Sequence, residues 1–381
     1  MKFDFFDKYT IDALELDVGA GCKKYVIDGR NKADFADLIC DAESLGATVL
    51  QKRECGENLF ATLKSDGGTV SISYFNYNHT ISIVTDPIGN RATPPLKAGE
   101  FERITKPKLC FLDLKSPEAS TQGNGLCMVY ILSDGSFIVY DGGYLDDGEG
   151  LIEFLNAHNL RDEKPRIAAW VLTHSHGDHY FAMTRIAEKY ADLVTVEDFI
   201  VNARDKGYEF EQYDPYLGEI FEKDALLKFK GARLVRPHTG QMLCYRDAQI
   251  EMLCTQDEIL PSRFRWLNET SIVSRVFLGG ESVLMPADAE LGIDVLIPAM
   301  YGDALKSDYL QETHHGFSGG SYVFYELTRP RVAFWTCTAP TFEKYCRPNY
   351  NNGYNYFLKG MVDANYCYGD GDVVIELDKK L

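Results

Sequence analysis

The feature that most constrains this chain is a histidine-rich stretch at the end of an apolar run. The run "RIAAWVLTH" leads into "LTHSHGDHY", which places His174, His176, Asp178 and His179 within six positions, although the 381 residues contain only eight histidines. The run has the composition of a buried strand, and "HYFAMTRIAEKYA" after it indicates a helix. A strand end followed at once by a helix start holds side chains on rigid supports. We therefore predict a metal site at this junction.

The donor types of this stretch also favour metal binding. Imidazole nitrogens are ligands of zinc and iron, and a mixed set of imidazoles and carboxylates suits two neighbouring ions. Asp178 stands in the first turn of the predicted helix, where the helix dipole favours a negative charge. The alternative is a polar turn whose histidines are satisfied by hydrogen bonds. The H-x-H-x-D-H spacing favours the metal site over that alternative.

Charge and composition limit the class of protein. Apolar residues make up 45% of the chain and the net charge is −18, which predicts a globular protein that repels long nucleic acids. No apolar run approaches the roughly twenty residues of a membrane helix, and the N-terminus lacks a signal-peptide pattern. The ten cysteines form no C-x-x-C pair. We expect free thiols, a cytoplasmic location and no membrane partner, and leave a homo-oligomer open.

The sequence predicts two domains. Residues 1–105 contain a helix pattern, "NKADFADLICDAESLG", followed by strand patterns, and predict a small α+β accessory domain without clustered chemistry. The Pro- and Gly-containing segment "IGNRATPPLKAGEF" has the character of a linker. Residues 106–381 alternate apolar strands with the helices "EGLIEFLNAHNL" and "HYFAMTRIAEKYA", which predicts an α/β fold.

Four segments of the second part resemble the metallo-β-lactamase superfamily. "HSHGDH" is similar to its H-x-H-x-D-H signature, and "GSFIVYDGG" is similar to the strand and turn that precede that signature. "NETSIVSRVFLGGESVLMPADAE" resembles the segment that carries the bridging aspartate, and "LKSDYLQETHHGFSGG" resembles the "HHG" branch, which includes the hydrolase domain of DNA-uptake (competence) proteins. The resemblance covers residues 107–381 and implies an αββα sandwich.

The resemblance also implies a set of ligands. Two divalent metal ions are expected, with Zn2+ the first choice and Mn2+ or Fe the alternatives. His174 and His176 would bind one ion, and Asp178 and His179 would bind the other. Asp288 would bridge the two ions, and one of His314 and His315 would complete the second site. Ala287 stands where the family often has glycine. The third histidine of the first ion has no clear counterpart, and His238 in "RPHTGQ" is the candidate.

Two positions keep alternatives open. Adjacent histidines on a strand point to opposite faces, so only one of His314 and His315 is expected to reach the ions. The other would either support a ligand without touching an ion or protonate a leaving group. Which histidine has which role stays undecided. Asp141, in the Asp-Gly-Gly turn, either orients a ligand histidine or forms the turn alone.

The implied function is hydrolysis by a metal-bound hydroxide at a dinuclear site, with Asp178 and His314 as catalytic candidates. The expected substrate is a small phosphodiester or another ester, with lactonase, thioesterase or β-lactamase-type activity as alternatives. Basic residues in "PSRFRW", with Lys306, Arg329 and Arg331, could contact a phosphate. The di-iron redox branch is disfavoured, because His176 replaces its glutamate. A metal-stabilised scaffold whose first 105 residues bind a partner is the non-enzymatic alternative.

Overall fold

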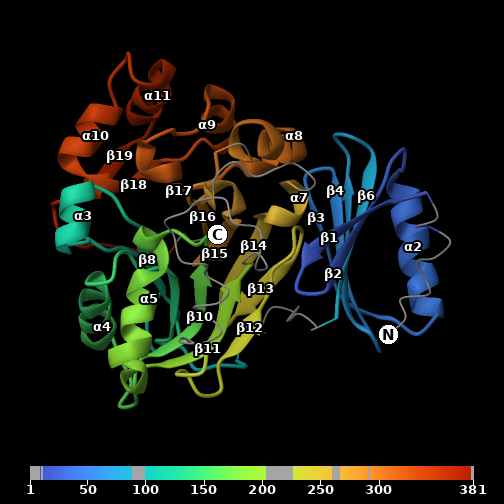
Figure 1. Ribbon diagram of the computed structural model, residues 1–381, viewed down its shortest axis with the longest axis horizontal. Helices are drawn as coiled ribbons and strands as arrows, with labels where there is room; N and C mark the ends of the chain where they lie inside the picture. The colour runs from blue at the N-terminus through green and yellow to red at the C-terminus, as the bar shows by residue number, and fades with distance from the viewer. Residues whose placement is uncertain are drawn as a thin grey trace.

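The part of the chain that the structure describes forms three sheets. The computed structural model describes residue 9 and residues 12–87, 99–202, 226–259, 267–290 and 292–378. One sheet has six strands and two have seven (Figure 1). Most of the predicted linker, at residues 88–98, and the basic segment "PSRFRW" at 261–266 lie outside the described residues.

The six-stranded sheet is antiparallel and comes from the first part of the chain. In spatial order its strands are β1 (Leu14–Gly19), β2 (Cys22–Ile27), β6 (Thr80–Asp86), β5 (Gly68–Phe75), β4 (Asn58–Ser65) and β3 (Thr48–Cys55). The sequence patterns predicted β3 to β6, whereas β1 and β2 were not recognised. β6 ends at Asp86 and β7 begins at Lys108, so the change of sheet spans the predicted boundary near residue 105.

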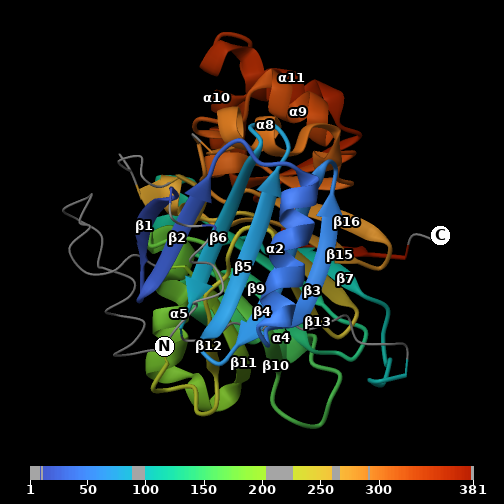
Figure 2. The same ribbon diagram turned by 90° about the vertical axis from the view of Figure 1, so that its right-hand side faces the viewer.

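Helix α2 (Lys32–Ser44) crosses the outer face of this sheet (Figure 2). It begins with a capping box: the Asn31 side chain accepts hydrogen bonds from the backbone N–H of Ala33 and Asp34, and the Asp34 carboxylate accepts one from the Asn31 N–H. Its buried residues, among them Phe35 and Leu38, pack on the apolar face of the sheet. The predicted helix over 31–46 is therefore present.

The second sheet holds the strand that leads into the histidine motif. In spatial order its strands are β12 (Arg233–Val235), β11 (Thr195–Val201), β10 (Arg166–Leu172), β9 (Phe137–Asp141), β8 (Cys127–Ile131), β7 (Lys108–Phe111) and β20 (Val373–Glu376). Strands β9 to β12 are parallel, so their carboxyl ends meet at one edge.

The third sheet follows in sequence, and its later strands are also parallel. In spatial order its strands are β13 (Met242–Tyr245), β14 (Ala248–Cys254), β15 (Val273–Leu278), β16 (Glu281–Met285), β17 (Tyr309–Gln311), β18 (Val332–Thr338) and β19 (Ala364–Tyr368). Strands β16 to β19 run in the same direction.

The two seven-stranded sheets pack face to face. Their facing side chains share one large hydrophobic core, in which the Tyr140 hydroxyl of β9 lies 2.8 Å from the Ser274 hydroxyl of β15. Helices cover the outer faces (Figure 1), namely α3 (Pro117–Gln122), α4 (Asp147–Ala157), α5 (Gly177–Lys189), α7 (Gln256–Ile259), α8 (Ile297–Tyr301), α9 (Tyr322–Thr328), α10 (Ala339–Tyr345) and α11 (Tyr354–Met361). The predicted αββα sandwich, preceded by a small strand-rich part, is confirmed.

Two expectations about the chain's chemistry can be compared with the fold. All ten cysteines are free thiols, and most of them are buried. Within the described ranges, every helix is too short or too polar to cross a bilayer.

Buried polar contacts join the six-stranded sheet to the sandwich. Glu251 of β14, whose side chain is 2% exposed, pairs with Arg53 of β3 at 2.6 Å and with Arg275 of β15 at 2.6 Å. The Asn58 side chain donates a hydrogen bond to the Met300 carbonyl at the same interface. Burial alone would raise the pKa of Glu251, but the two guanidinium groups hold it below its usual value. Glu251 is therefore a charged anchor between the two parts.

The anchor yields a stability prediction. We expect Glu251→Gln to lower the free energy of unfolding by about 3–5 kcal/mol, because two buried guanidinium groups lose their counter-charge. Urea unfolding followed by circular dichroism measures the change. The matched control is Glu57→Gln, which removes the exposed partner of Lys32 and should leave the transition unchanged. Equal midpoints for the two variants would contradict the assigned role of Glu251.

Candidate metal centre

The histidine motif lies at the carboxyl end of β10. Residues 173–176 connect β10 to α5, and His176 stands at the N-cap of that helix. Gly177 is required between His176 and Asp178, because a Cβ at this position would lie 2.4 Å from the Phe181 ring. The strand–helix junction that the sequence predicted is present.

Asp288 reaches the same place from the third sheet. It follows β16 after a turn in which Ala287 has a φ of +52°, a left-handed conformation in which glycine is less strained. The Gln311 side chain holds this turn: its Oε1 accepts a hydrogen bond from the Ala287 N–H at 2.7 Å. The Ala287 conformation gives a physical reason for the glycine that the family often has here.

The His314–His315 pair corrects one expectation. The two residues do not lie on a strand: β17 ends at Gln311, and the pair forms a tight turn with φ of +46° and +54°. The alternation of a strand therefore does not apply, and both rings face Asp288. His315 Nε2 lies 3.3 Å and His314 Nε2 3.8 Å from Asp288 Oδ2. His315 is the closer of the two and is buried, whereas His314 is partly exposed.

Asp288 Oδ2 is the common point of the cluster. The Nε2 atoms of His174 and His179 lie 3.8 and 3.3 Å from it, in addition to the two histidines of the turn. Asp178 Oδ2 adds a second carboxylate, 3.1 Å from His315 Nε2. His176 lies beside this group, with its Nδ1 2.9 Å from His174 Nε2. The predicted residues of the motif, Asp288 and both turn histidines are thus brought together.

The cluster fits metal ions. Two overlapping sets of donor atoms are present, and the atoms of each set all lie within 4.8 Å of one another. The first set comes from His174, His179 and Asp288, and the second comes from Asp178, His179 and His315. Ligands about 2.0–2.2 Å from a tetrahedral ion are themselves about 3.4 Å apart, close to the spacings around Asp288 Oδ2. The buried Asp288 Oδ1 has no hydrogen-bond partner among the described residues. A cation between these donors would satisfy that oxygen.

Two of the rings are oriented by hydrogen bonds at their outer nitrogens. Asp141 Oδ2 lies 2.8 Å from His179 Nδ1, and the Asp141 carboxylate also accepts hydrogen bonds from the N–H and hydroxyl of Thr173. Thr336 holds His315 Nδ1 through its carbonyl and hydroxyl. Each contact leaves Nε2 directed into the cluster. Asp141 has φ of +54°, so it both forms the turn and orients a histidine.

The electrostatics of the cluster favour positive charge. Burial opposes protonation of His315, but Asp288 and Asp178 raise its pKa to about 9. The same carboxylates, with Asp141, raise the pKa of His179 despite its burial. Burial would raise the pKa of Asp178 and of Asp288, yet the surrounding imidazoles hold both well below the usual range. His174 differs, because burial and the neighbouring imidazoles lower its pKa.

His238 and the basic candidates lie elsewhere. His238 belongs to a separate group with Cys22 and Asp86, and its Nδ1 lies 2.7 Å from Asp257 Oδ2. Arg331 pairs with Glu281 at the amino end of β16, opposite to the end that leads to Asp288. The segments that carry Lys306 and Arg329 precede the parallel strands β17 and β18 and lie at that same edge. These three basic residues are therefore not placed to contact a substrate at the cluster.

Sequence reasoning missed four polar partners of the cluster. The Asn124 amide donates a hydrogen bond to Asp178 Oδ2 at 2.8 Å, and its own oxygen accepts one from the Tyr144 hydroxyl. Glu290 pairs with His314 Nδ1, and Asn268 Nδ2 lies 3.2 Å from His314 Nε2. Asn268 and Glu290 are the first and last residues of the segment "NETSIVSRVFLGGESVLMPADAE", which carries Asp288. Their polar side chains in that segment could have marked them as candidates. Asn124 is isolated in sequence and carried no such signal.

A family model described as the metallo-beta-lactamase superfamily matches residues 121–312. No curated protein sequence gives a significant match. One similar solved structure is the metallo-beta-lactamase fold protein YhfI from Bacillus subtilis, with 12% sequence identity and a TM-score of 0.42 over 71% of this chain and 99% of that one. A second is the diiron beta-hydroxylase CmlA from Streptomyces venezuelae, with 12% identity and a TM-score of 0.42 over 71% of this chain and 54% of that one. A third is Zn2+-bound PqqB from Methylobacterium extorquens, with 10% identity and a TM-score of 0.44 over 71% of this chain and 100% of that one. The match thus spans about half the length of the hydroxylase.

The contact between Asp141 and His179 generates a prediction. We expect Asp141→Asn to weaken zinc binding roughly 10- to 100-fold, because His179 loses the carboxylate that fixes its ring and strengthens it as a ligand. Competition with a chromophoric chelator measures the affinity. Asp134→Asn is the matched control, since Asp134 is a buried aspartate beside Arg246 in the turn before the same strand. An unchanged affinity in Asp141→Asn would contradict the orienting role.

Proposed function

Because the chain belongs to the metallo-beta-lactamase superfamily, we propose that it is a metal-dependent hydrolase with a two-metal centre, acting on a phosphodiester or another ester. The observation that carries the proposal is the position of Asp288 Oδ2, which lies within 3.8 Å of the Nε2 atoms of His174, His179, His314 and His315. One carboxylate oxygen shared by imidazoles from both sheets supports a bridging role for Asp288.

The ligand assignment is the one that the resemblance implies, and the contacts around Asp288 support it. His174 and His176 would hold one ion, Asp178, His179 and His315 the other, and Asp288 both. Two divalent ions there would polarise the bond to be cleaved and lower the pKa of a water molecule towards neutrality. We propose Zn2+, because tetrahedral imidazole and carboxylate sites suit it.

Asp178 is suited to position the attacking water. Its Oδ2 accepts a hydrogen bond from Asn124, which is itself fixed by the Tyr144 hydroxyl. These contacts hold the carboxylate in one orientation, and its lowered pKa keeps it ionised. It can then accept a hydrogen bond from the water and orient it as the substrate is attacked.

His314 is suited to protonate the leaving group. Its ring is partly exposed, and Glu290 pairs with its Nδ1. Burial opposes ionisation of Glu290, but its hydrogen bond to His314 keeps its pKa below the usual value. The Glu290 carboxylate fixes the ring through Nδ1, so that Nε2 is free to give a proton to a departing oxygen. We therefore assign His315 to metal binding and His314 to proton transfer.

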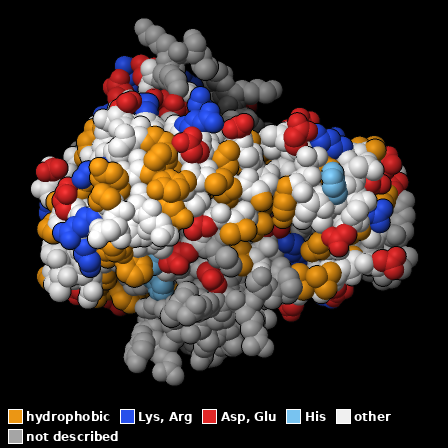
Figure 3. Space-filling view, turned by 90° about the horizontal axis from the view of Figure 1, so that it is seen from above, with side chains coloured by type: hydrophobic (Ala, Val, Ile, Leu, Met, Phe, Trp, Pro, Cys, Tyr) orange, Lys and Arg blue, Asp and Glu red, His pale blue; other side chains and the backbone are white. Residues whose placement is uncertain are grey.

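The surface supports a small substrate. On the face drawn in Figure 3, Lys and Arg side chains stand at separate points among acidic ones, rather than in a continuous positive stripe. Such a stripe supplies most of the affinity for long nucleic acids. With a net charge of −18, this arrangement favours a short phosphodiester or a neutral ester over a polymer.

The bridging role of Asp288 can be tested first. We expect purified protein to contain about two zinc equivalents and to cleave bis(p-nitrophenyl) phosphate. Asp288→Ala should lose metal and activity together, because the shared ligand is removed. Asp303→Ala changes an exposed aspartate that lies between β16 and β17, and this variant should retain both metal and activity. Elemental analysis and absorbance assays give the readouts. Two iron atoms without hydrolysis would overturn the proposal, whereas zinc without phosphodiester cleavage would exclude only this substrate.

The division of roles between the two turn histidines gives a second test. His314→Gln should keep its metal but lower kcat about 10²–10⁴-fold on phosphodiesters with alkoxide leaving groups. The loss should be much smaller with p-nitrophenolate, which leaves without protonation. His315→Gln should instead lose metal. Loss of metal from His314→Gln would contradict the assignment.

A further inference from the structure

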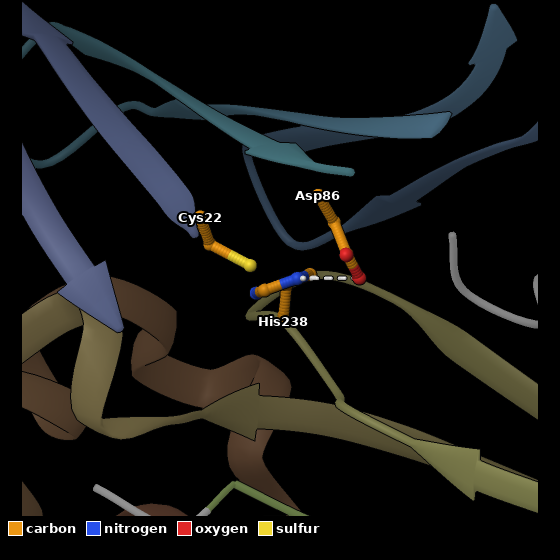
Figure 4. A group of neighbouring side chains, drawn as sticks. All are labelled: Cys22, Asp86 and His238. Atoms are coloured by element: carbon orange, nitrogen blue, oxygen red, sulfur yellow. Dashed lines mark ion pairs between the residues drawn. The ribbon is translucent and has the colours of Figure 1, made fainter. Parts of the chain in front are cut away.

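We propose that Cys22, Asp86 and His238 form a separate metal site that joins the six-stranded sheet to the sandwich (Figure 4). The Cys22 sulfur, a carboxylate oxygen of Asp86 and a ring nitrogen of His238 all lie within 4.8 Å of one another. All three residues are buried. This site shares no residue with the centre around Asp288 and needs none of its chemistry.

The backbone brings the three side chains together from distant parts of the chain. Cys22 is the first residue of β2 and Asp86 is the last of β6, and these strands are neighbours whose register pairs Lys23 with Thr85. Continuing that register places Cys22 beside Asp86. His238 comes from the segment between β12 and β13 in the sandwich. An ion held here would therefore bind both parts of the chain.

The ring of His238 is prepared for a ligand. Its Nδ1 lies 2.7 Å from Asp257 Oδ2, and Asp257 is fully buried. Its Nε2 is also buried and faces Asp86, with which it forms an ion pair (Figure 4). A carboxylate on one ring nitrogen orients the other nitrogen as in histidines that bind zinc.

The distance between His238 and Asp86 can be compared with a direct hydrogen bond and with two ligands of one ion. His238 Nε2 lies 3.5 Å from Asp86 Oδ2. A direct charge-assisted hydrogen bond would bring these atoms to about 2.7–2.9 Å. Two ligands of one tetrahedral zinc ion, each about 2.0–2.2 Å from it, lie about 3.4 Å apart. The observed separation matches the second case.

The ligand types select the class of ion. A thiolate, an imidazole and a carboxylate suit Zn2+ or another borderline transition ion, rather than Mg2+ or Ca2+. With a thiolate at Cys22, an ionised Asp86 and a neutral His238, a divalent ion makes the group neutral, which reduces the cost of its burial. Three protein ligands leave the fourth tetrahedral position to a water molecule. An ion bound here would hold the six-stranded sheet and the sandwich together.

Cobalt substitution tests the proposal without reference to activity. The donors of the Asp288 cluster include no cysteine, so a sulfur-to-cobalt charge-transfer band reports the Cys22 site alone. The full chain, refolded with Co2+, should show this band at one equivalent per chain. The Asp288→Ala variant should keep it, which separates this proposal from the proposed hydrolase. A cobalt-loaded chain without the band would overturn the site.

Matched variants locate the sulfur ligand. Cys22→Ser should lose the band and the thermal stabilisation that added Zn2+ gives, whereas Cys40→Ser, at an exposed cysteine of α2, should keep both. Asp257→Asn should lower the affinity for Co2+ about 10- to 100-fold, because His238 loses its orienting carboxylate. A band that survives in Cys22→Ser would overturn the proposal. X-ray absorption of the zinc form of the wild type gives a check that needs no variant, as a sulfur ligand lies at about 2.3 Å.

Discussion

The two seven-stranded sheets converge on one buried oxygen, Oδ2 of Asp288. His174 and His179 approach it from the carboxyl end of β10, and His314 and His315 approach it from the turn after β17. Buried carboxylates and imidazoles at these separations are stable only when their charges are balanced. The packing of one sheet on the other therefore sets the spacing of the donors, and the apolar core between the sheets has a direct role in building the site.

The sequence contained the parts of this centre that depend on local order. The motif at residues 174–179 could be assigned because an apolar run, three histidines and a helix pattern follow one another directly. Asp288 and the His314–His315 pair were identified through resemblance of their segments, and the structure brings them to the motif. The αββα fold was predictable for the same reason: most of its strands are apolar runs bounded by turn residues.

Features that depend on backbone conformation or long-range pairing were not predictable. The left-handed conformations of His314 and His315 turn both rings to one side, which no strand pattern indicates. β2 was missed because its lysines interrupt the apolar alternation, although Lys24 is buried against the Asp257 carbonyl. Cys22 and Asp86, which lie beside His238, come from strands more than 150 residues earlier in the chain. Composition and spacing along the sequence carry no information about contacts between residues so far apart in the chain.

The edge strand β20 has a consequence for the order in which the molecule folds. β20 pairs with β7, so the sheet that carries the histidine motif contains a strand made some 260 residues after its neighbour. The Leu377 N–H also donates a hydrogen bond to the Pro107 carbonyl, 2.9 Å away. During synthesis on the ribosome, β7 must wait with an unpaired edge until β20 emerges. Such an edge can pair with another chain, so the nascent protein is open to intermolecular association at β7 until β20 covers that edge.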